Sequence, residues 1–255
     1  MAPERINVLG VGVSAINMDD ALRVVGEWIA AGRQEYVCFC TVHGVMDCQR
    51  HHELKQIFNA AGMVTPDGMP MVWLGRRRHP HVARVYGPDF MLAEFGRSRE
   101  SGHRHFFYGG RPGVGVKLAE TMKERFPGLE IVGVMEPPFA SLDELCTPET
   151  AAKINASGAD VVWVGIGSPK QEYWIARMRP LLHAPVLLAV GAAFDFHSGA
   201  VVQAPRWMQR AGLEWSFRLA SDPRRLWRRY LVDNPWFLFA IALQGLGLRR
   251  YELQR

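Results

Sequence analysis

Short β-branched runs alternate with amphipathic helical stretches along the first three quarters of this chain. In residues 19–31, for example, apolar side chains such as Val25 and Trp28 recur at helical spacing. Repeated strand–helix–strand units build an open parallel sheet with helices on both faces. The sequence therefore predicts a doubly wound, mostly parallel α/β body over residues 1–198. We expect strands at 6–11, 36–42, 63–65, 105–108, 129–134, 160–165 and 186–190, and helices at 19–31, 52–61, 114–126, 148–157 and 169–182.

The positive charge of the chain is concentrated in residues 199–255. This segment holds ten arginines, no lysine and four acids, a net charge of +6, whereas the whole chain carries +5. Four of the eight tryptophans also lie there. Guanidinium and indole groups together suit a surface that contacts phosphates and lipid headgroups. We therefore expect a helical, Arg/Trp-rich appendage that docks on an anionic membrane surface, with helices at roughly 205–220, 223–233 and 235–248. An ordinary helical cap with solvated arginines is the alternative.

Other features of the chain indicate which partners it binds and where in the cell it is found. The charge is confined to the tail, so we do not expect nucleic-acid binding. Four cysteines form no CxxC pair, as expected of free thiols in a reducing cytoplasm. The N-terminal run resembles a first strand, not a signal peptide. The longest apolar run, 236–243, is far shorter than the ~20 residues that span a bilayer. We expect a cytoplasmic protein, peripheral at the inner face of the cell membrane.

Five of the expected strands end in loops that combine small residues with the start of a helix. Ligands of open parallel sheets bind at the carboxyl ends of the strands, where free N–H groups of helix starts can hold an anion. Several such loops at one edge indicate a site for a nucleotide diphosphate. The loops are 41–44, 65–70, 108–113, 165–172 and 191–195, and their candidate binding residues include Gly109, Gly110, Gly167, Gly191 and Asp195.

Each of these loops also has a purely structural interpretation. Asp67 could cap the helix that follows it, and Ser168 with Gln171 has the spacing of a capping box. The run from Gly109 lacks the GxGxxG spacing, but Glu136 follows the next strand, where a ribose-binding acid would be expected. A dinucleotide-dependent oxidoreductase therefore stays open. The histidine pairs 79/81 and 103/105 lack nearby thiols or carboxylates, and no Asp-x-Asp is present, so we expect no metal site.

Several longer segments, taken together, resemble one family. They are TPDGMPMVW (65–73), ARVYGPDFM (83–91), VWVGIGSPKQEYW (162–174), VGAAFDFHSG (190–199) and APRWMQRAGLEWSFRLASDPRRLWRRYL (204–231). In this order they resemble the WecG/TagA/CpsF family of bacterial glycosyltransferases over nearly the whole chain. The resemblance implies an inverting transferase that uses no metal or other cofactor. It also implies transfer of a hexose or N-acetylhexosamine-type sugar from a UDP-sugar to a polyprenyl-diphosphate-linked saccharide, with a membrane-docking tail that completes the active site.

The resemblance also assigns roles to particular residues. Asp67 matches the catalytic base, and Thr41, Arg84 and Gln171 match residues of the sugar-diphosphate pocket. The tail arginines that reach the active site would be Arg218, Arg225 and Arg228, although the doublets 224/225 and 228/229 leave the register open by one.

His43 departs from the family pattern. Amino-sugar transferases of the family usually carry Asn at this position, two residues after the Thr. Together with the sequence segments GMP and VYGPD, His43 favours an exopolysaccharide-type member and argues against an N-acetylmannosamine donor.

The fold class that we expect is α/β, a Rossmann-like sheet with a helical appendage. Besides the transferase, the oxidoreductase and a non-catalytic module that binds anionic lipid remain as alternatives. The donor sugar, the acceptor sugar and homo-oligomerisation are left open by the sequence.

Overall fold

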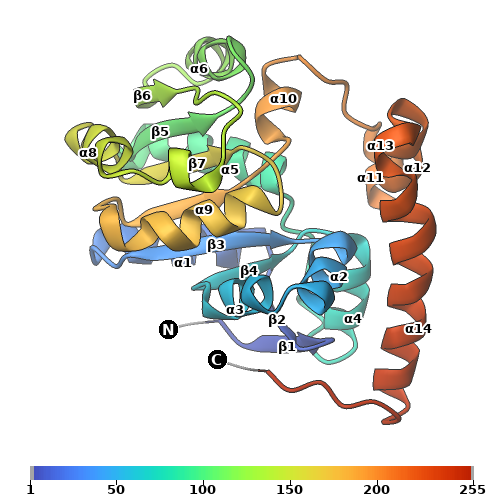
Figure 1. The fold of residues 1–255 in the computed structure, drawn as a ribbon. Coiled ribbons are helices and arrows are strands. Elements are labelled where there is room, and N and C mark those ends of the chain that lie inside the picture. Colours follow the sequence, from blue (N-terminus) through green and yellow to red (C-terminus); the bar gives the residue numbers. More distant parts are fainter. Residues whose placement is uncertain (1–2, 254–255) are drawn as a thin grey trace.

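Six parallel strands form the central sheet of the computed structural model, which describes residues 3–253 (Figure 1). The strand order is β4-β3-β8-β7-β5-β6, and every neighbouring pair is parallel, so all carboxyl ends lie at one edge. This confirms the expected α/β class. The strands are β3 (Glu35–Cys40), β4 (Met63–Pro66), β5 (Arg104–Gly109), β6 (Glu130–Met135), β7 (Val161–Gly165) and β8 (Val186–Ala189).

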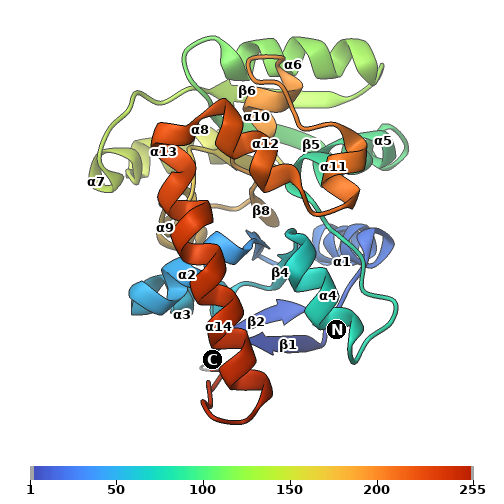
Figure 2. The same ribbon diagram turned by 90° about the vertical axis from the view of Figure 1, so that its right-hand side faces the viewer.

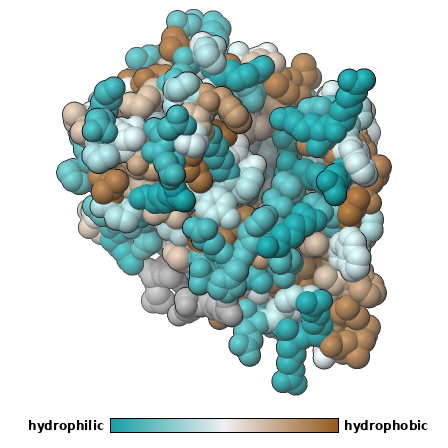
Figure 3. All heavy atoms as spheres, viewed as in Figure 1, coloured by the Kyte–Doolittle hydropathy of each residue, from teal (hydrophilic) through white to brown (hydrophobic). Residues whose placement is uncertain are grey.

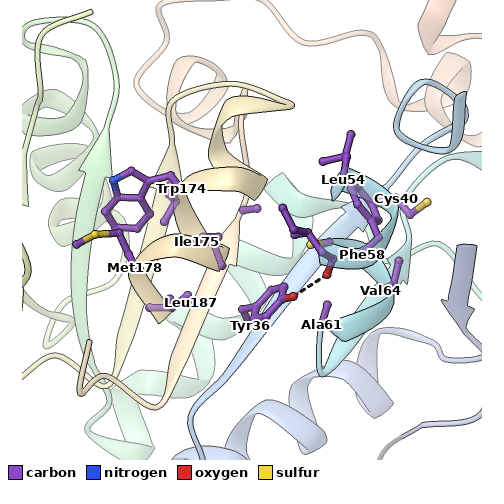
Figure 4. Close-up of a cluster of buried hydrophobic side chains, with 14 of the residues drawn as sticks. Tyr36, Cys40, Leu54, Phe58, Ala61, Val64, Trp174, Ile175, Met178 and Leu187 are labelled. Carbon is purple, nitrogen blue, oxygen red and sulfur yellow. Dashed lines mark hydrogen bonds between the residues drawn. The ribbon is translucent and has the colours of Figure 1, made fainter. Parts of the chain in front are cut away.

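Helices cover both faces of the sheet because successive side chains of each strand point to opposite sides. In β3, Tyr36 and Cys38 join the core of one face, and Val37 and Phe39 join the core of the other. Figure 4 shows part of the first core, where the Tyr36 hydroxyl donates to the carbonyl of Ile57 at 2.6 Å. That face carries α2 (Val42–Arg50), α3 (His52–Ala60), α7 (Leu142–Leu145), α8 (Pro148–Ala156) and α9 (Lys170–Met178), and the opposite face carries α1 (Met18–Ala30), α5 (Gly87–Ser101), α6 (Val114–Arg125) and α10 (Ala193–His197).

The N-terminal run that we expected as a single strand is a hairpin. Its strands, β1 (Arg5–Val8) and β2 (Val11–Ser14), pair antiparallel in a separate two-stranded sheet. Leu9 and Gly10, with φ of 52° and 83°, form the turn between them. The Leu9 N–H donates to the side chain of Gln244 at 3.0 Å, and its carbonyl accepts from Gln49 at 2.8 Å. The sequence did not indicate this turn, because Leu9 and Gly10 lie inside a run of apolar residues.

Helices α2, α4 (Met69–Arg76), α5, α7 and α10 were not expected from the sequence. The strand expected over 36–42 ends at Cys40, because the next residue, Thr41, caps α2 by accepting from the Gly44 N–H at 3.4 Å. Helix α5 begins with Gly87-Pro88, a pair that reads as a loop, although proline is well tolerated in the first helical turn. It buries three large side chains, Phe90, Met91 and Phe95.

The tail is helical but not divided as expected. After α11 (Arg206–Arg210) and α12 (Glu214–Ser221), one continuous rod runs through α13 (Pro223–Trp227), the π-helical segment η2 (Arg228–Val232) and α14 (Asp233–Gly245) (Figure 2). Asp222 caps this rod by accepting from the Arg225 N–H at 3.4 Å. Pro235 does not end it, because the proline lies in the first turn of α14, directly after the π-helical segment, and proline is well tolerated in a first helical turn. No helix within residues 3–253 is long and apolar enough to cross a bilayer.

Candidate functional site

The carboxyl ends of the neighbouring strands β3 and β4 bring Thr41 and Asp67 together. The backbone N–H groups of Asp67 and Gly68 both donate to the Cys40 carbonyl, at 3.1 and 3.2 Å. A Cβ on Gly68 would lie 3.6 Å from the Thr41 Cα, so the two loops touch through backbone atoms. The Asp67 side chain is only 11% exposed. Both residues therefore lie at the edge of the sheet where ligands of such folds bind.

Burial is the main influence on the carboxyl group of Asp67. It raises the pKa of Asp67 to about 7, against an opposing effect of Arg84 and with a smaller contribution from Glu214 in the same direction. Arg84 Nη2 lies 3.5 Å from Asp67 Oδ1. The structure does not use this carboxylate as a cap of α4, because no side chain caps that helix. A carboxylate with a pKa near neutrality can accept a proton at physiological pH.

Arg84 connects Asp67 to the tail. Its Nε donates to the main-chain oxygen of Asp67 at 2.5 Å, and its Nη2 lies 2.7 Å from Glu214 Oε2 in α12. The guanidinium lies 4.1 Å above the ring of Tyr86, whose hydroxyl donates to Glu214 Oε1 at 3.1 Å. We did not single out Glu214 and Tyr86 from the sequence, although both lie inside segments that carry the family resemblance, LEW and VYGPD.

The tail places two arginines near this group. Arg218 is half-buried, 3.9 Å from Glu214 Oε1 and with its guanidinium 5.8 Å from the centre of the Phe196 ring. Arg229, in η2, has a buried Nε that makes no hydrogen bond within the described chain. Burial lowers the pKa of Arg229, and the nearby charge of Arg218 lowers it further. Two guanidinium groups close to one another, of which Arg229 has an Nε without a hydrogen-bond partner in the described chain, are suited to holding an anion.

The other two arginines that the resemblance assigned to the site lie at the surface. Arg225 is exposed and pairs with Asp222 at 2.7 Å, one turn back on the same rod. Arg228 is exposed beside Trp227. The structure therefore brings Arg218 to the group around Asp67 and leaves Arg225 and Arg228 outside it. Arg229, from the second doublet, is half-buried, with its Nε in the interior.

His43 lies in a second polar group at the junction of α2 and the tail. Its Nδ1 is 3.4 Å from Asp233 Oδ2, and its Nε2 is 3.2 Å from Asp47 Oδ2. Burial lowers the pKa of His43, as does the charge of Arg229, while both carboxylates oppose the shift. Because its usual pKa is already below 7, the imidazole is mostly neutral at neutral pH.

Gln171, in the first turn of α9, is buried at the same edge. Its Nε2 donates to the carbonyl of Ala189 at 2.9 Å, whereas its Oε1 is buried without a hydrogen-bond partner in the described chain. The capping-box interpretation of Ser168 is wrong, since no side chain caps α9 and the Ser168 hydroxyl donates to Glu172 Oε1 at 2.8 Å. The free oxygen of Gln171 lies next to Gly191 and can accept from a ligand N–H or hydroxyl.

The glycine-rich loop after β5 packs against its neighbour strand. A Cβ on Gly109 would lie 2.5 Å from the Gly165 carbonyl, and the Gly110 N–H donates to that oxygen at 3.0 Å. Gly110 and Gly167 both have φ of 85°, a conformation that favours glycine. Asp195, in α10, lies 3.5 Å from Arg111 Nη2 of the same loop region. These residues shape the edge on the side away from Asp67.

Glu136 closes the start of α6. Its carboxylate accepts from the backbone N–H groups of Gly113, Gly115 and Val116, at 2.9, 2.5 and 3.0 Å. These are the donors that a dinucleotide phosphate would need, and the acid expected to bind ribose is the group that occupies them. The arrangement contradicts the dinucleotide interpretation of this loop.

The expectation that the histidine pairs have no nearby carboxylate is wrong, because His103 Nδ1 lies 2.8 Å from Glu94 Oε1 and His79 Nε2 lies 3.7 Å from Glu4 Oε1. His81 Nε2 lies 2.9 Å from the Ala15 carbonyl, and His105 is buried between Ser98 and Trp163, where desolvation lowers the pKa of His105 to about 3. Within residues 3–253, no group of three or more His, Cys, Asp or Glu side chains is arranged to hold a metal ion.

Comparison with known proteins identifies the family of the chain. The sequence profile described as the glycosyl transferase WecG/TagA/CpsF family matches residues 6–251. The chain belongs to this family. It is also similar to the N-acetylglucosaminyldiphosphoundecaprenol N-acetyl-beta-D-mannosaminyltransferase of Bacillus spizizenii, with 32% identity over 196 residues, 76% of this chain and 74% of that protein. The resemblance in the motifs is confirmed, and the protein is a glycosyltransferase.

Proposed function

We propose that this glycosyltransferase moves a hexose or N-acetylhexosamine-type sugar from a UDP-sugar to a polyprenyl-diphosphate-linked saccharide, with inversion and without a metal ion. The observation that carries the proposal is the buried carboxyl group of Asp67, with its pKa raised to about 7, at the strand ends beside Arg84 and the tail. The name of the Bacillus spizizenii relative describes an acceptor of this lipid-diphosphate kind, which supports the acceptor class.

The reaction that suits this geometry is a direct displacement at the anomeric carbon. Asp67 takes the proton of the acceptor hydroxyl while that oxygen bonds to the anomeric carbon. The bond from this carbon to the diphosphate oxygen breaks on the opposite face, and UDP leaves with the electron pair. A single displacement of this type inverts the configuration of the transferred sugar.

The leaving diphosphate gains negative charge that the protein must stabilise. We assign this task to Arg218, which lies 3.9 Å from Glu214 Oε1, and to Arg229, whose Nε has no hydrogen-bond partner in the described chain. Thr41, Arg84 and Gln171 line the same edge, and the free Oε1 of Gln171 is suited to a donor group of the bound nucleotide sugar. Charge stabilisation by arginines predicts that activity persists in saturating EDTA. Loss of activity in EDTA that returns on addition of Mg²⁺ or Mn²⁺ would contradict this part of the proposal.

The outer side of the tail is suited to the surface of an anionic membrane. Trp236 and Phe239 in α14 are 55% and 56% exposed, and the exposed arginines 224, 225 and 228 lie on the same rod. Figure 3 shows hydrophobic side chains along the right-hand edge of the view, over α14. Docking of this side at the inner membrane face would bring α12, with Glu214 and Arg218, to the place where the lipid acceptor resides.

His43 bears on the identity of the donor sugar. His43 stands at the position where amino-sugar transferases of the family carry Asn, and it is fixed by Asp47 and Asp233. We therefore place the protein in an exopolysaccharide-type branch whose donor differs from the N-acetylmannosaminyl group named for the relative. A hydrolysis screen over UDP-hexoses and UDP-N-acetylhexosamines tests this, and a preference for UDP-N-acetylmannosamine would contradict it.

The base assignment has its own experiment. Asp67→Asn keeps the size of the side chain and removes its basicity, so transfer should fall by about 10²–10⁴-fold, the usual loss when general-base help is removed. Turnover is measured with a detergent-solubilised, short-chain lipid acceptor. The affinity for UDP, measured by calorimetry, should stay close to that of the wild type. Wild-type turnover in this variant would remove Asp67 from the mechanism.

A further inference from the structure

Two carboxylates share one guanidinium at the centre of the candidate site. Arg84 Nη2 is 2.7 Å from Glu214 Oε2 but 3.5 Å from Asp67 Oδ1. The closer and stronger contact is therefore made to the tail residue, not to the proposed base. The side chains of Asp67, Arg84 and Glu214 are all less than one-fifth exposed, so water screens these interactions only weakly.

The position of Glu214 is fixed on its other side as well. The Tyr86 hydroxyl donates to Glu214 Oε1 at 3.1 Å, and Arg218 Nη1 lies 3.9 Å from the same oxygen. Arg84 is in turn held by its Nε contact to the main-chain oxygen of Asp67 and by the Tyr86 ring below it. The guanidinium thus touches the backbone of Asp67 while its Nη2 is directed to Glu214.

A general base loses strength when a cation pairs closely with it, because the cation stabilises the charged form. We propose that Glu214 is a positioning residue that draws Arg84 away from the carboxylate of Asp67 and so preserves the basicity that proton removal from the acceptor requires. This inference rests on the proposed function of Asp67. It gives a tail residue a part in the chemistry without any contact between that residue and the reacting atoms.

The other groups that face Asp67 are consistent with this role. Arg84 and Arg218 lower its pKa, while burial and the negative charge of Glu214 raise it. The charge of Arg229 in η2 also acts on Asp67. The remaining titratable neighbours, Tyr86 and Cys40, have pKa values raised by burial and stay neutral. Among the groups that act on Asp67, Glu214 is the negative charge that offsets the arginines, and α12 supplies it from the tail.

The test is the pH dependence of kcat/KM in the full-length protein. Glu214→Gln removes the charge and frees Arg84 Nη2 for Asp67, so the acidic limb of the profile should move to lower pH by about one pH unit. The plateau should fall, because a weaker base transfers the proton more slowly. Glu214→Asp retains the charge and should restore the limb toward its wild-type position. Tyr86→Phe loosens Glu214 without altering any charge, and we expect a smaller displacement in the same direction.

A merely structural role gives a different result. In that case Glu214→Gln lowers the melting temperature or the yield of folded protein, and the acidic limb of the remaining activity stays at the wild-type pH, which overturns the inference. If Glu214→Gln does not fold, an unmoved limb in Tyr86→Phe overturns the inference instead. The Asp67→Asn variant distinguishes failure of the inference about Glu214 from failure of the proposed function. If Asp67→Asn is inactive and the limb is unmoved, only the role of Glu214 fails, whereas an active Asp67→Asn refutes the base assignment itself.

Discussion

The carboxylate of Asp233, in the first turn of α14, accepts hydrogen bonds from the guanidinium of Arg50 in α2. The Asp233 side chain is 5% exposed, and Arg50 also reaches Asp47 at 3.1 Å. This ion pair fixes the rod of the tail to the body a few residues after Arg229. It therefore helps to set where the tail arginines lie.

Breaking this pair should loosen the tail. Asp233→Asn removes the charge that Arg50 pairs with in the tail, although the contact of Arg50 with Asp47 remains, and we expect a loss of about 1–3 kcal/mol in the free energy of unfolding. Denaturant unfolding gives the magnitude, and limited trypsin digestion reports earlier cleavage in the tail. Arg177→Gln serves as the control, because it breaks a 2.7 Å pair with Asp143 that is exposed and should cost much less. Equal losses in the two variants would show that the burial of Asp233 does not increase the contribution of its ion pair to the free energy of unfolding.

The raised pKa of Asp67 also predicts how stability depends on pH. The folded state binds this proton more tightly than the unfolded state, so the contribution of Asp67 to stability is present at low pH. It is lost as the pH rises from the unfolded value near 4 to the folded value of about 7. Asp67→Asn cannot ionise and should be more stable than the wild type at pH 8, by on the order of 4 kcal/mol, with the difference disappearing near pH 4.

Melting curves of both proteins from pH 4 to pH 8 check this. A stability difference that stays constant with pH would show that Asp67 has an ordinary pKa and is not set up as a base near neutrality. The gain in stability and the loss of turnover should then come from the same substitution, as is common for buried groups that serve catalysis at a cost in stability.

The sheet could be predicted from the sequence because its signals are local. Alternation such as Tyr36-Val37-Cys38-Phe39 in β3 follows from a strand buried on both faces. Signals that depend on the rest of the fold were missed. Leu9-Gly10 turns the chain inside an apolar run, and Gly87-Pro88 starts a helix where the sequence suggests a loop.

In the candidate site, too, some residues could be predicted from local signals and others depend on the rest of the fold. Asp67, Thr41 and Gln171 follow strands, so a rule about strand ends locates them. Glu214 could not be placed, because its contact with Arg84 depends on how the tail folds back on the body. The choice between Arg228 and Arg229 depends on a π-helical turn, and such a turn has no reliable spacing in sequence.

The half-buried arginine of the second doublet, Arg229, should matter more for transfer than its exposed neighbour Arg228. Arg229→Gln removes a guanidinium whose Nε has no hydrogen bond in the described chain, and we expect kcat to fall by about 10²-fold, as for loss of a preorganised donor to the transition state. Arg228→Gln removes the same charge from the surface and should have a clearly smaller effect. Turnover is measured with a short-chain acceptor in detergent, so that membrane docking does not limit the rate.

Arg210→Gln is the control for this comparison, since Arg210 is an exposed tail arginine outside the candidate site. It should retain wild-type turnover. A larger loss in Arg228→Gln than in Arg229→Gln would mean that the working tail follows the register implied by the family resemblance and not the one in this structure.

The exposed aromatic side chains of α14 should act in membrane docking and not in chemistry. Trp236 and Phe239 have ring centroids 5.9 Å apart and form an apolar patch on a rod that also carries exposed arginines. Replacing both with Ser keeps the charge of the tail and removes the apolar part of the contact. Sedimentation with vesicles that contain anionic lipid should then show binding weakened by about tenfold or more, since burial of each large side chain contributes about 1.5–3 kcal/mol. Turnover with the detergent-solubilised acceptor should stay within about twofold of the wild type if the patch lies outside the active site. No membrane is present in this assay, so loss of the membrane contact cannot change the rate of transfer. Leu181→Ser is the matched control, because this side chain is also exposed but follows α9 at the opposite edge of the sheet. Unchanged vesicle binding in the double variant, or the same loss in Leu181→Ser, would contradict docking through α14.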